Sequence, residues 1–170
     1  VPLGRLRALA EGGDAVTPVA DVLPFALPAR RDGDSTFAEL KVEPTPAGAS
    51  HAALQLASTT DSSTARWRTL PAITPVNRIG APKPGATVLL RGAAAEGGER
   101  QPVLLYQRFG RGLVVAFPTQ DSWLWQMHAD IPVADLTHET LWRQLLRWLV
   151  ADVPGQLAAS VSADAVEPGE

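Results

Sequence analysis

Two histidines and an aspartate in the C-terminal half are the residues best suited to bind a metal ion. His128, Asp130 and His138 lie within eleven positions of one another, and Asp121 and Asp135 are nearby. Imidazole and carboxylate groups together are a workable ligand set for zinc or iron. The spacing matches no established ligand pattern, and His138 falls in the first turn of a predicted helix. We therefore predict no metal site, and these three residues are the candidates that a metal would use.

Ser122 is the candidate nucleophile, because it follows an apolar run and could meet His138 in space. With Asp121 as the acid, these residues could form a hydrolytic triad, since such sites are recognised by geometry and not by order. No serine lies in the Gly-x-Ser-x-Gly turn that exposes the hydroxyl in many hydrolases. A hydrolase with a site near Asp121, Ser122, His128 and His138 is therefore an alternative, and no catalytic residue is predicted.

The composition excludes several classes of function. The 170 residues include no cysteine, which excludes disulfides, thiolate metal sites and a cysteine nucleophile. The formal net charge of −3 gives no electrostatic basis for binding nucleic acid. No run approaches the ~20 apolar residues that span a bilayer, and no glycine-rich loop precedes a helix to hold a phosphate. We predict no cofactor, no nucleic-acid partner and no direct membrane insertion.

The five tryptophans are half of the ten aromatic residues. Exposed tryptophans stack on sugars or anchor a partner protein, so a carbohydrate-binding module is a second alternative. Trp123 and Trp125 alternate just beyond a predicted strand, and Trp142 and Trp148 lie on a helix that must cover the sheet. We predict that these four are structural core residues, and that Trp67 is the most exposed of the five.

The elements that would position these residues are clearest in the second half. Strands are predicted at 86–90, 103–109 and 113–117, and the three-residue glycine loop before the last one indicates a hairpin. The last run is almost continuously apolar, which favours a strand covered on both faces. A helix is predicted over 137–150, with Leu145 in its apolar stripe. Shorter helices are predicted near 18–23, 50–57 and 65–70.

Three segments of the C-terminal half resemble one protein family. They are QRFGRGLVVAF (107–117), TQDSWLW (119–125) and HETLWRQLLRWL (138–149). Shorter pieces upstream, such as TPVADVLP (17–24) and KPGATVL (83–89), fall in the expected order. The family is the glutamine amidotransferase-like domain of large bacterial membrane-anchored proteins, and the resemblance covers about residues 1–150.

The resemblance implies an α/β fold of the class I glutamine amidotransferase-like type, a flavodoxin-like parallel sheet flanked by helices. The chain would be the C-terminal portion of that domain, over residues 1–152. Residues 153–170 would be a linker or the start of a following β-sandwich. The family's catalytic cysteine has no counterpart here, and its histidine is replaced by Thr119-Gln120-Asp121. The resemblance thus implies a module that is not an enzyme.

The main functional prediction is a non-catalytic structural or interaction module of a larger envelope-associated bacterial protein. Its partners would be other domains of the same parent chain or members of an envelope assembly. By the family resemblance, the module would lie in the extracytoplasmic part of a membrane-anchored protein. The hydrolase and the carbohydrate-binding module are the two alternatives.

Overall fold

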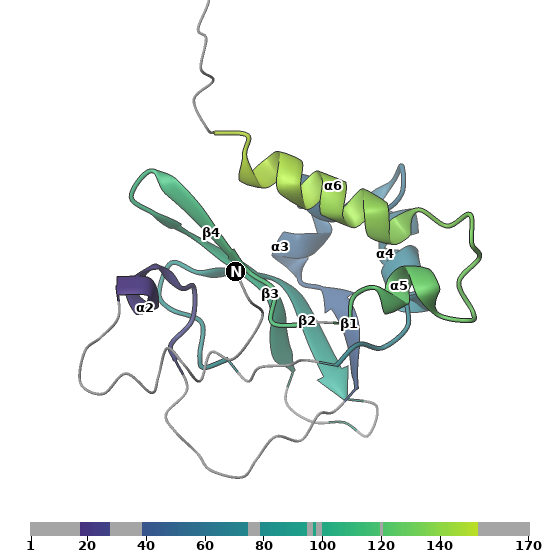
Figure 1. Cartoon of the computed structure of the whole chain (residues 1–170), viewed down its shortest axis with the longest axis horizontal. Coiled ribbons are helices and arrows are strands. Elements are labelled where there is room, and N and C mark those ends of the chain that lie inside the picture. Colours follow the sequence, from purple (N-terminus) through teal and green to yellow (C-terminus); the bar gives the residue numbers. More distant parts are fainter. Residues whose placement is uncertain are drawn as a thin grey trace, which may run out of the picture.

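The four strands of the described residues form one antiparallel sheet. The computed structural model describes residues 18–27, 39–74, 79–94, 97, 100–119 and 121–152. Within these residues the sheet has the order β1-β2-β3-β4, the same as the order along the chain (Figure 1). The strands are β1 (Leu40–Pro44), β2 (Thr87–Ala94), β3 (Gln101–Phe109) and β4 (Gly112–Ala116).

The predicted parallel, flavodoxin-like sheet is wrong, because all three strand pairs are antiparallel. The connection between β3 and β4 is only Gly110 and Arg111, and Gly110 adopts a φ of 58° in the left-handed region that such tight turns use. The connection between β2 and β3 spans only 95–100. A parallel connection needs a dozen or more residues to cross over, so neither pair could be parallel.

The predicted hairpin of 103–109 with 113–117 is confirmed as β3 and β4, but the predicted burial of the second strand is wrong. β4 is an edge strand of the described sheet, and its side chains are half-buried or exposed. Its continuous apolar run reflects packing of Val115 against the core on one side.

The helices agree in part with the sequence predictions. They are α2 (Pro18–Val22), α3 (Pro46–Ala49), the 3-10 helix η1 (Ala52–Leu54), α4 (Thr60–Thr69), α5 (Leu124–Met127) and α6 (Thr137–Leu149). The predicted helix at 137–150 is confirmed as α6. The predicted helix at 50–57 is wrong except for the short η1, because α3 ends before it and Ser50 follows the last residue of α3. The one predicted at 65–70 begins earlier, because the Thr59 hydroxyl accepts a hydrogen bond from the Ser62 amide and caps α4.

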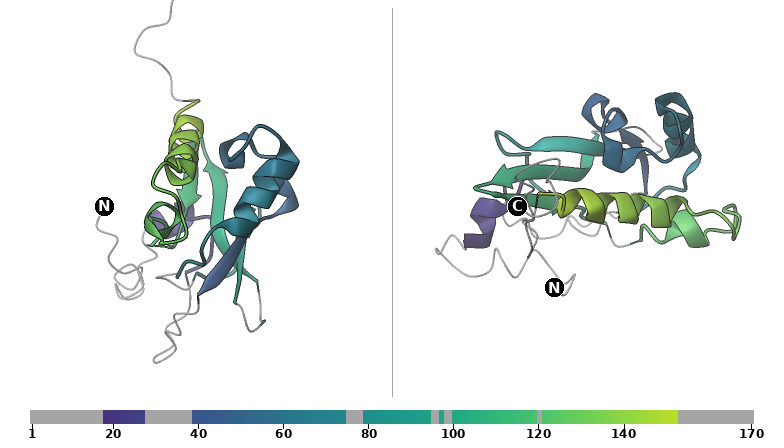
Figure 2. Two further views of the ribbon diagram at one scale, coloured as in Figure 1. Left: turned by 90° about the vertical axis from the view of Figure 1, so that its right-hand side faces the viewer. Right: turned by 90° about the horizontal axis from the view of Figure 1, so that it is seen from above.

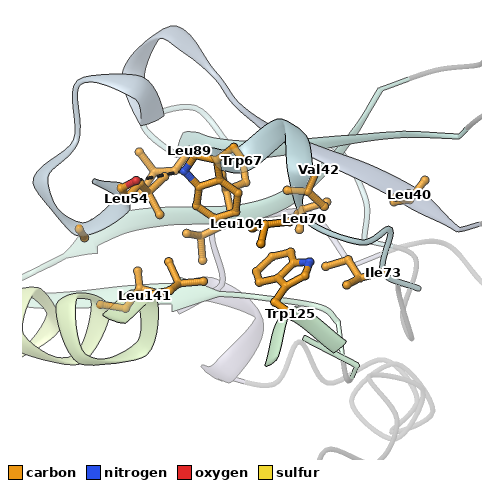
Figure 3. Close-up of a cluster of buried hydrophobic side chains, with 14 residues drawn as sticks. Leu40, Val42, Leu54, Trp67, Leu70, Ile73, Leu89, Leu104, Trp125 and Leu141 are labelled. Atoms are coloured by element: carbon orange, nitrogen blue, oxygen red, sulfur yellow. Dashed lines mark hydrogen bonds between the residues drawn. The ribbon is translucent and has the colours of Figure 1, made fainter. Parts of the chain in front are cut away.

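One hydrophobic core joins the sheet to these helices. The turned views in Figure 2 place α5 and α6 together on one side of the core, and α3 and α4 together on the other. Trp67 and Trp125 meet edge to face at its centre, with ring centroids 5.5 Å apart (Figure 3). Both indoles are buried with their N–H groups satisfied, since Trp67 donates to the Leu54 carbonyl at 3.0 Å and Trp125 to the Pro71 carbonyl at 2.9 Å.

Helix α6 packs over β3 and over the segment that follows β4. Leu141 and Leu145 are buried in the core. Trp148 packs edge to face on Tyr106 of β3, with centroids 4.9 Å apart. Trp142 packs in the same way on Phe117, with centroids 5.7 Å apart. The predicted placement of the amphipathic helix across the C-terminal strands is therefore confirmed.

The N-terminal segment 18–27 is tied to β3. The side-chain amide of Gln107 donates to the carbonyls of Val22 and Leu23, both at 3.0 Å, and so satisfies carbonyls at the end of α2. Phe25 is buried and forms an isolated antiparallel bridge with Pro82. The Gln107 amide thus caps the C-terminal end of α2 from a distant strand.

Two predictions cannot be compared with this fold. The predicted linker or β-sandwich start at 153–170 lies outside the described residues, as do residues 1–17 of the predicted domain. Within the described part of the chain, none of the helices combines the length and the apolar character that a bilayer crossing requires.

Candidate functional site

Ser122 and His138 are brought together, as the hydrolase alternative requires. Ser122 lies in the turn before α5, and His138 lies in the first turn of α6. The Ser122 Oγ is 3.4 Å from the His138 Nε2. This contact is long for a hydrogen bond that involves a hydroxyl.

The lone pair of His138 Nε2 is already used by a different donor. The indole Nε1–H of Trp142 donates to it at 2.9 Å. His138 is then neutral, with its proton on Nδ1, which lies 3.3 Å from the side-chain oxygen of Gln126. Burial lowers the pKa of His138 below its ordinary value of 6.5, which also favours the neutral ring. The ring has no free lone pair with which to accept the Ser122 proton.

Asp121 does not complete a triad. Its Oδ2 accepts a hydrogen bond from the Thr74 amide at 2.7 Å. Its other carboxylate oxygen is buried and has no hydrogen-bond partner among the described residues. The position that a triad carboxylate would occupy, next to His138 Nδ1, is held by the neutral amide of Gln126. The geometry therefore joins the predicted serine to the predicted histidine without the predicted acid.

The metal-ligand candidates do not converge. The Nδ1 of His128 lies 3.2 Å from the Asp130 amide and 3.5 Å from the Asp130 carboxylate. Both ring nitrogens of His138 face other side chains. No group of three or more His, Asp or Glu side chains that could hold a metal ion is found among the described residues.

The tryptophans are distributed differently from the prediction. Trp67 is buried, with 1% of its surface exposed, so the prediction that it is the most exposed is wrong. Trp125 is fully buried, as predicted, and Trp142 and Trp148 are half-buried against the core. Trp123 was predicted in the core but is 50% exposed. It is the only one of the five with half its surface exposed, so the chain does not present a row of stacked tryptophans to a sugar.

A half-buried ion pair that the sequence analysis did not single out holds the loop before α6. Arg66 of α4 contacts Asp135 at 2.5 Å and donates to the Thr137 hydroxyl at 2.9 Å. Burial alone would raise the pKa of Asp135, but hydrogen bonds from Thr137 and the charge of Arg66 lower it below its ordinary value. The pair lies 69 positions apart in sequence, and no local pattern marks it.

Four exposed apolar side chains lie between position 123, just before α5, and position 136, just before α6. The exposed fractions are 50% for Trp123, 74% for Met127, 99% for Val133 and 55% for Leu136. Trp123 and Met127 are one helical turn apart and so share a face of α5. We call these four residues the α5–α6 surface. Single exposed apolar residues are ordinary, but tryptophan and methionine are among the residue types enriched at protein interfaces.

The charged side chains near this surface are mostly acidic, although Arg66 lies against Asp135 and Arg143 contacts Glu139. No lysine or arginine occurs between Arg111 and Arg143, whereas Asp121, Asp130, Asp135 and Glu139 fall in that interval. The side chains of Asp130 and Glu139 are 88% and 55% exposed. The α5–α6 surface is therefore apolar with acidic side chains near it in the chain.

Comparisons with known proteins do not assign this chain to a family. No known protein-family model matches the sequence, and no curated protein shows significant similarity to it.

Proposed function

We propose that this chain is a non-catalytic interaction module that binds a partner protein through the α5–α6 surface. The observation that carries the proposal is the exposure of Trp123, Met127, Val133 and Leu136 within fourteen residues of a chain whose other tryptophans are buried or half-buried. Tryptophan and methionine are enriched at protein interfaces, where they provide large contact areas. The proposal keeps the interaction role predicted from sequence without the parallel fold that accompanied it.

The charges specify the chemistry of the partner. Asp135 and Glu139 already contact Arg66 and Arg143. The 88% exposed side chain of Asp130, and the absence of lysine and arginine from 112–142, favour a protein surface that carries lysine or arginine around an apolar centre. Opposite charges at the rim of an interface increase the association rate and select the partner. An acidic partner would be repelled by the same residues.

A catalytic role for the neighbouring Ser122 is not supported by its contacts. Activation of a serine requires a base with a free lone pair and a group that orients the base. The indole of Trp142 occupies the lone pair of His138, and an amide rather than a carboxylate faces the other ring nitrogen. These contacts fit a structural role, in which His138 connects α5 to α6.

The test uses two displayed peptide libraries of amphipathic helices, one with basic and one with acidic polar faces. We expect the purified chain to enrich binders from the basic library only. Replacement of Trp123 by Ser together with Met127 by Gln should abolish binding of the enriched peptides, and added salt should weaken it. The matched control is Leu146→Ser, because Leu146 is also 55% exposed but lies outside the α5–α6 surface.

Two results would contradict the proposal. One is enrichment of binders that remain bound to the Trp123 and Met127 double variant but are lost from the Leu146 variant. The other is failure of both libraries to give any binder. Circular dichroism of each variant would verify that a loss of binding does not arise from unfolding.

A further inference from the structure

A groove runs along the outer surface of β1 and β2, away from the α5–α6 surface in sequence. Leu40 and Val42 are buried, so the alternate residues Lys41 and Glu43 point out of the core. In the antiparallel register, Glu43 is opposite Arg91 of β2. These outward side chains help to line a cavity of about 620 Å³ that also borders Pro82 and the turn into α3. This volume is within the range of small-molecule sites, about 300–1,000 Å³.

The groove is positively charged in a chain that is negative overall. Among the residues that the structure describes, its lining includes the cationic side chains of Lys41, Arg91 and Arg100 and one carboxylate, that of Glu43. The net charge of the whole chain is −3. Cations gathered along a recess raise the local concentration of small anions and favour their binding.

The contacts within the groove leave the central pair of charges separate. Glu43 and Arg91 face each other across β1 and β2 in the described sheet, yet they do not form an ion pair with each other. Lys41 is held in place, because its ammonium group donates to the carbonyl of Leu70 at the end of α4. An arginine and a carboxylate side by side provide both donors and acceptors to one ligand.

We infer that this groove binds a small organic anion that carries hydroxyl groups, such as a sugar phosphate or a sugar acid. The guanidinium of Arg91 presents paired N–H donors that match a phosphate or carboxylate. Lys41 and Arg100 add positive charge, and Glu43 accepts hydrogen bonds from ligand hydroxyls. The ligand's anionic group and its hydroxyl groups are both needed, which separates this class from neutral sugars and from simple inorganic anions.

This binding site is independent of the proposed protein interaction. It uses residues of β1 and β2 and Arg100, just before β3, whereas the proposed interaction uses residues 123–136. Failure of either proposal therefore leaves the other unaffected.

The experiment measures binding to the full chain by calorimetry and by chemical-shift changes. The probes are glucose 6-phosphate and glucuronate, with glucose and inorganic phosphate as comparisons. We expect at least one of the two organic anions to bind more tightly than both comparison compounds, with shifts at Lys41, Glu43 and Arg91. Arg91→Gln should weaken this binding about tenfold or more, because the charged hydrogen bonds are lost.

Two further variants sharpen the test. Arg100→Gln should also weaken binding, whereas Arg68→Gln on the exposed part of α4 should not, since Arg68 lies outside the groove. Circular dichroism of each variant would verify folding. The inference is overturned when neither organic anion binds, when inorganic phosphate binds as tightly as both, or when folded Arg91→Gln and Arg100→Gln variants bind as the parent does.

Discussion

Trp123 and Trp125 are two residues apart, yet they belong to different regions of the molecule. Trp125 is fully buried against Trp67 and Phe117, whereas Trp123 is 50% exposed on the α5–α6 surface. Residues two apart in an α-helix point about 200° apart, because each residue turns by about 100°. The short helix α5 therefore places one tryptophan in the core and leaves the other for solvent or a partner. Trp125 therefore contributes to stability, whereas Trp123 is available for the proposed binding.

The largest expected effect is the loss of a buried tryptophan. Trp125→Ala and Trp67→Ala should each lower the free energy of unfolding by about 3–5 kcal/mol, because each leaves a large cavity and removes a satisfied hydrogen bond. Urea denaturation followed by circular dichroism would measure the change. Trp123→Ala is the matched control and should change stability by less than about 0.5 kcal/mol.

Equal losses for Trp123→Ala and Trp125→Ala would contradict the division between the two regions. That result would mean that the side chain of Trp123 packs against the protein in solution. The α5–α6 surface would then lose its principal residue as a binding site.

A second matched pair tests the same division on α6. Leu145 is 6% exposed and Leu146 is 55% exposed. Leu145→Ala should cost about 2–5 kcal/mol, and Leu146→Ala should cost less than about 0.5 kcal/mol. Denaturant midpoints of the two variants, measured in parallel, would check this difference. A reversed order would mean that α6 is rotated about its axis relative to the sheet.

The two half-buried histidines make the core sensitive to pH. Burial lowers the pKa values of His51 and His138 below 6.5. The unfolded chain then binds more protons than the folded chain, so stability is complete above pH 6.5 and falls as the pH drops toward the folded pKa values. We expect a lower free energy of unfolding at pH 5.5 than at pH 7.5, and a smaller difference in the double variant His51→Gln with His138→Gln.

An unchanged pH difference in that double variant would show that other groups cause it. The ion pair of Asp135 with Arg66 affects the pH dependence of stability only at lower pH. The folded pKa of Asp135 is below 3.8, so its contribution is lost only as the pH falls below that value. Measurements above pH 5 therefore separate the histidines from this pair.

The directions of the β2–β3 and β3–β4 pairs could have been predicted from connection lengths. Two residues between β3 and β4, and six at 95–100 between β2 and β3, are too few for a parallel crossover. The hairpin and the long amphipathic helix were predicted because each has a strong local pattern. The parallel sheet came from a family resemblance, and the short connections already contradicted it.

The burial of individual tryptophans could not be predicted from local patterns. Trp123 and Trp125 alternate just beyond a predicted strand, and alternate residues of an extended chain share a face. The chain instead forms the helix α5 at 124–127, which separates the two side chains. Trp67 lies on a helix whose only other buried residue is Ser63. The Ser63 hydroxyl donates to the Leu54 carbonyl, so a residue that resembled part of a polar loop is a buried contact.

The residues of the candidate site were predicted from the sequence, but their hydrogen bonds were not. The sequence allowed Ser122 to meet His138 in space, and the two side chains are 3.4 Å apart. The indole that occupies His138 comes from Trp142, one helical turn later, and was predicted only as core. A pair at this i, i+4 spacing on a helix is visible in a sequence, but the choice of hydrogen bond depends on the tertiary position of α5.

The smallest expected effect concerns Ser122, which lies at the border between the two regions. Ser122→Ala should leave any background hydrolysis of p-nitrophenyl acetate unchanged, because the His138 lone pair accepts from Trp142 and cannot accept the serine proton. The variant should also change the free energy of unfolding by less than about 1 kcal/mol, since the only side-chain hydrogen bond of Ser122 among the described residues is long.

Trp142→Phe makes the test of Ser122 sharper, because it removes the indole donor and frees the His138 lone pair. We still expect no gain in hydrolysis, since the Gln126 amide, and not a carboxylate, faces His138 Nδ1. A carboxylate at that position would orient the ring and stabilise its protonated form, and both effects are absent here. A rate that rises in Trp142→Phe and falls again when Ser122→Ala is added would show that one lone pair alone separates this site from a working hydrolase.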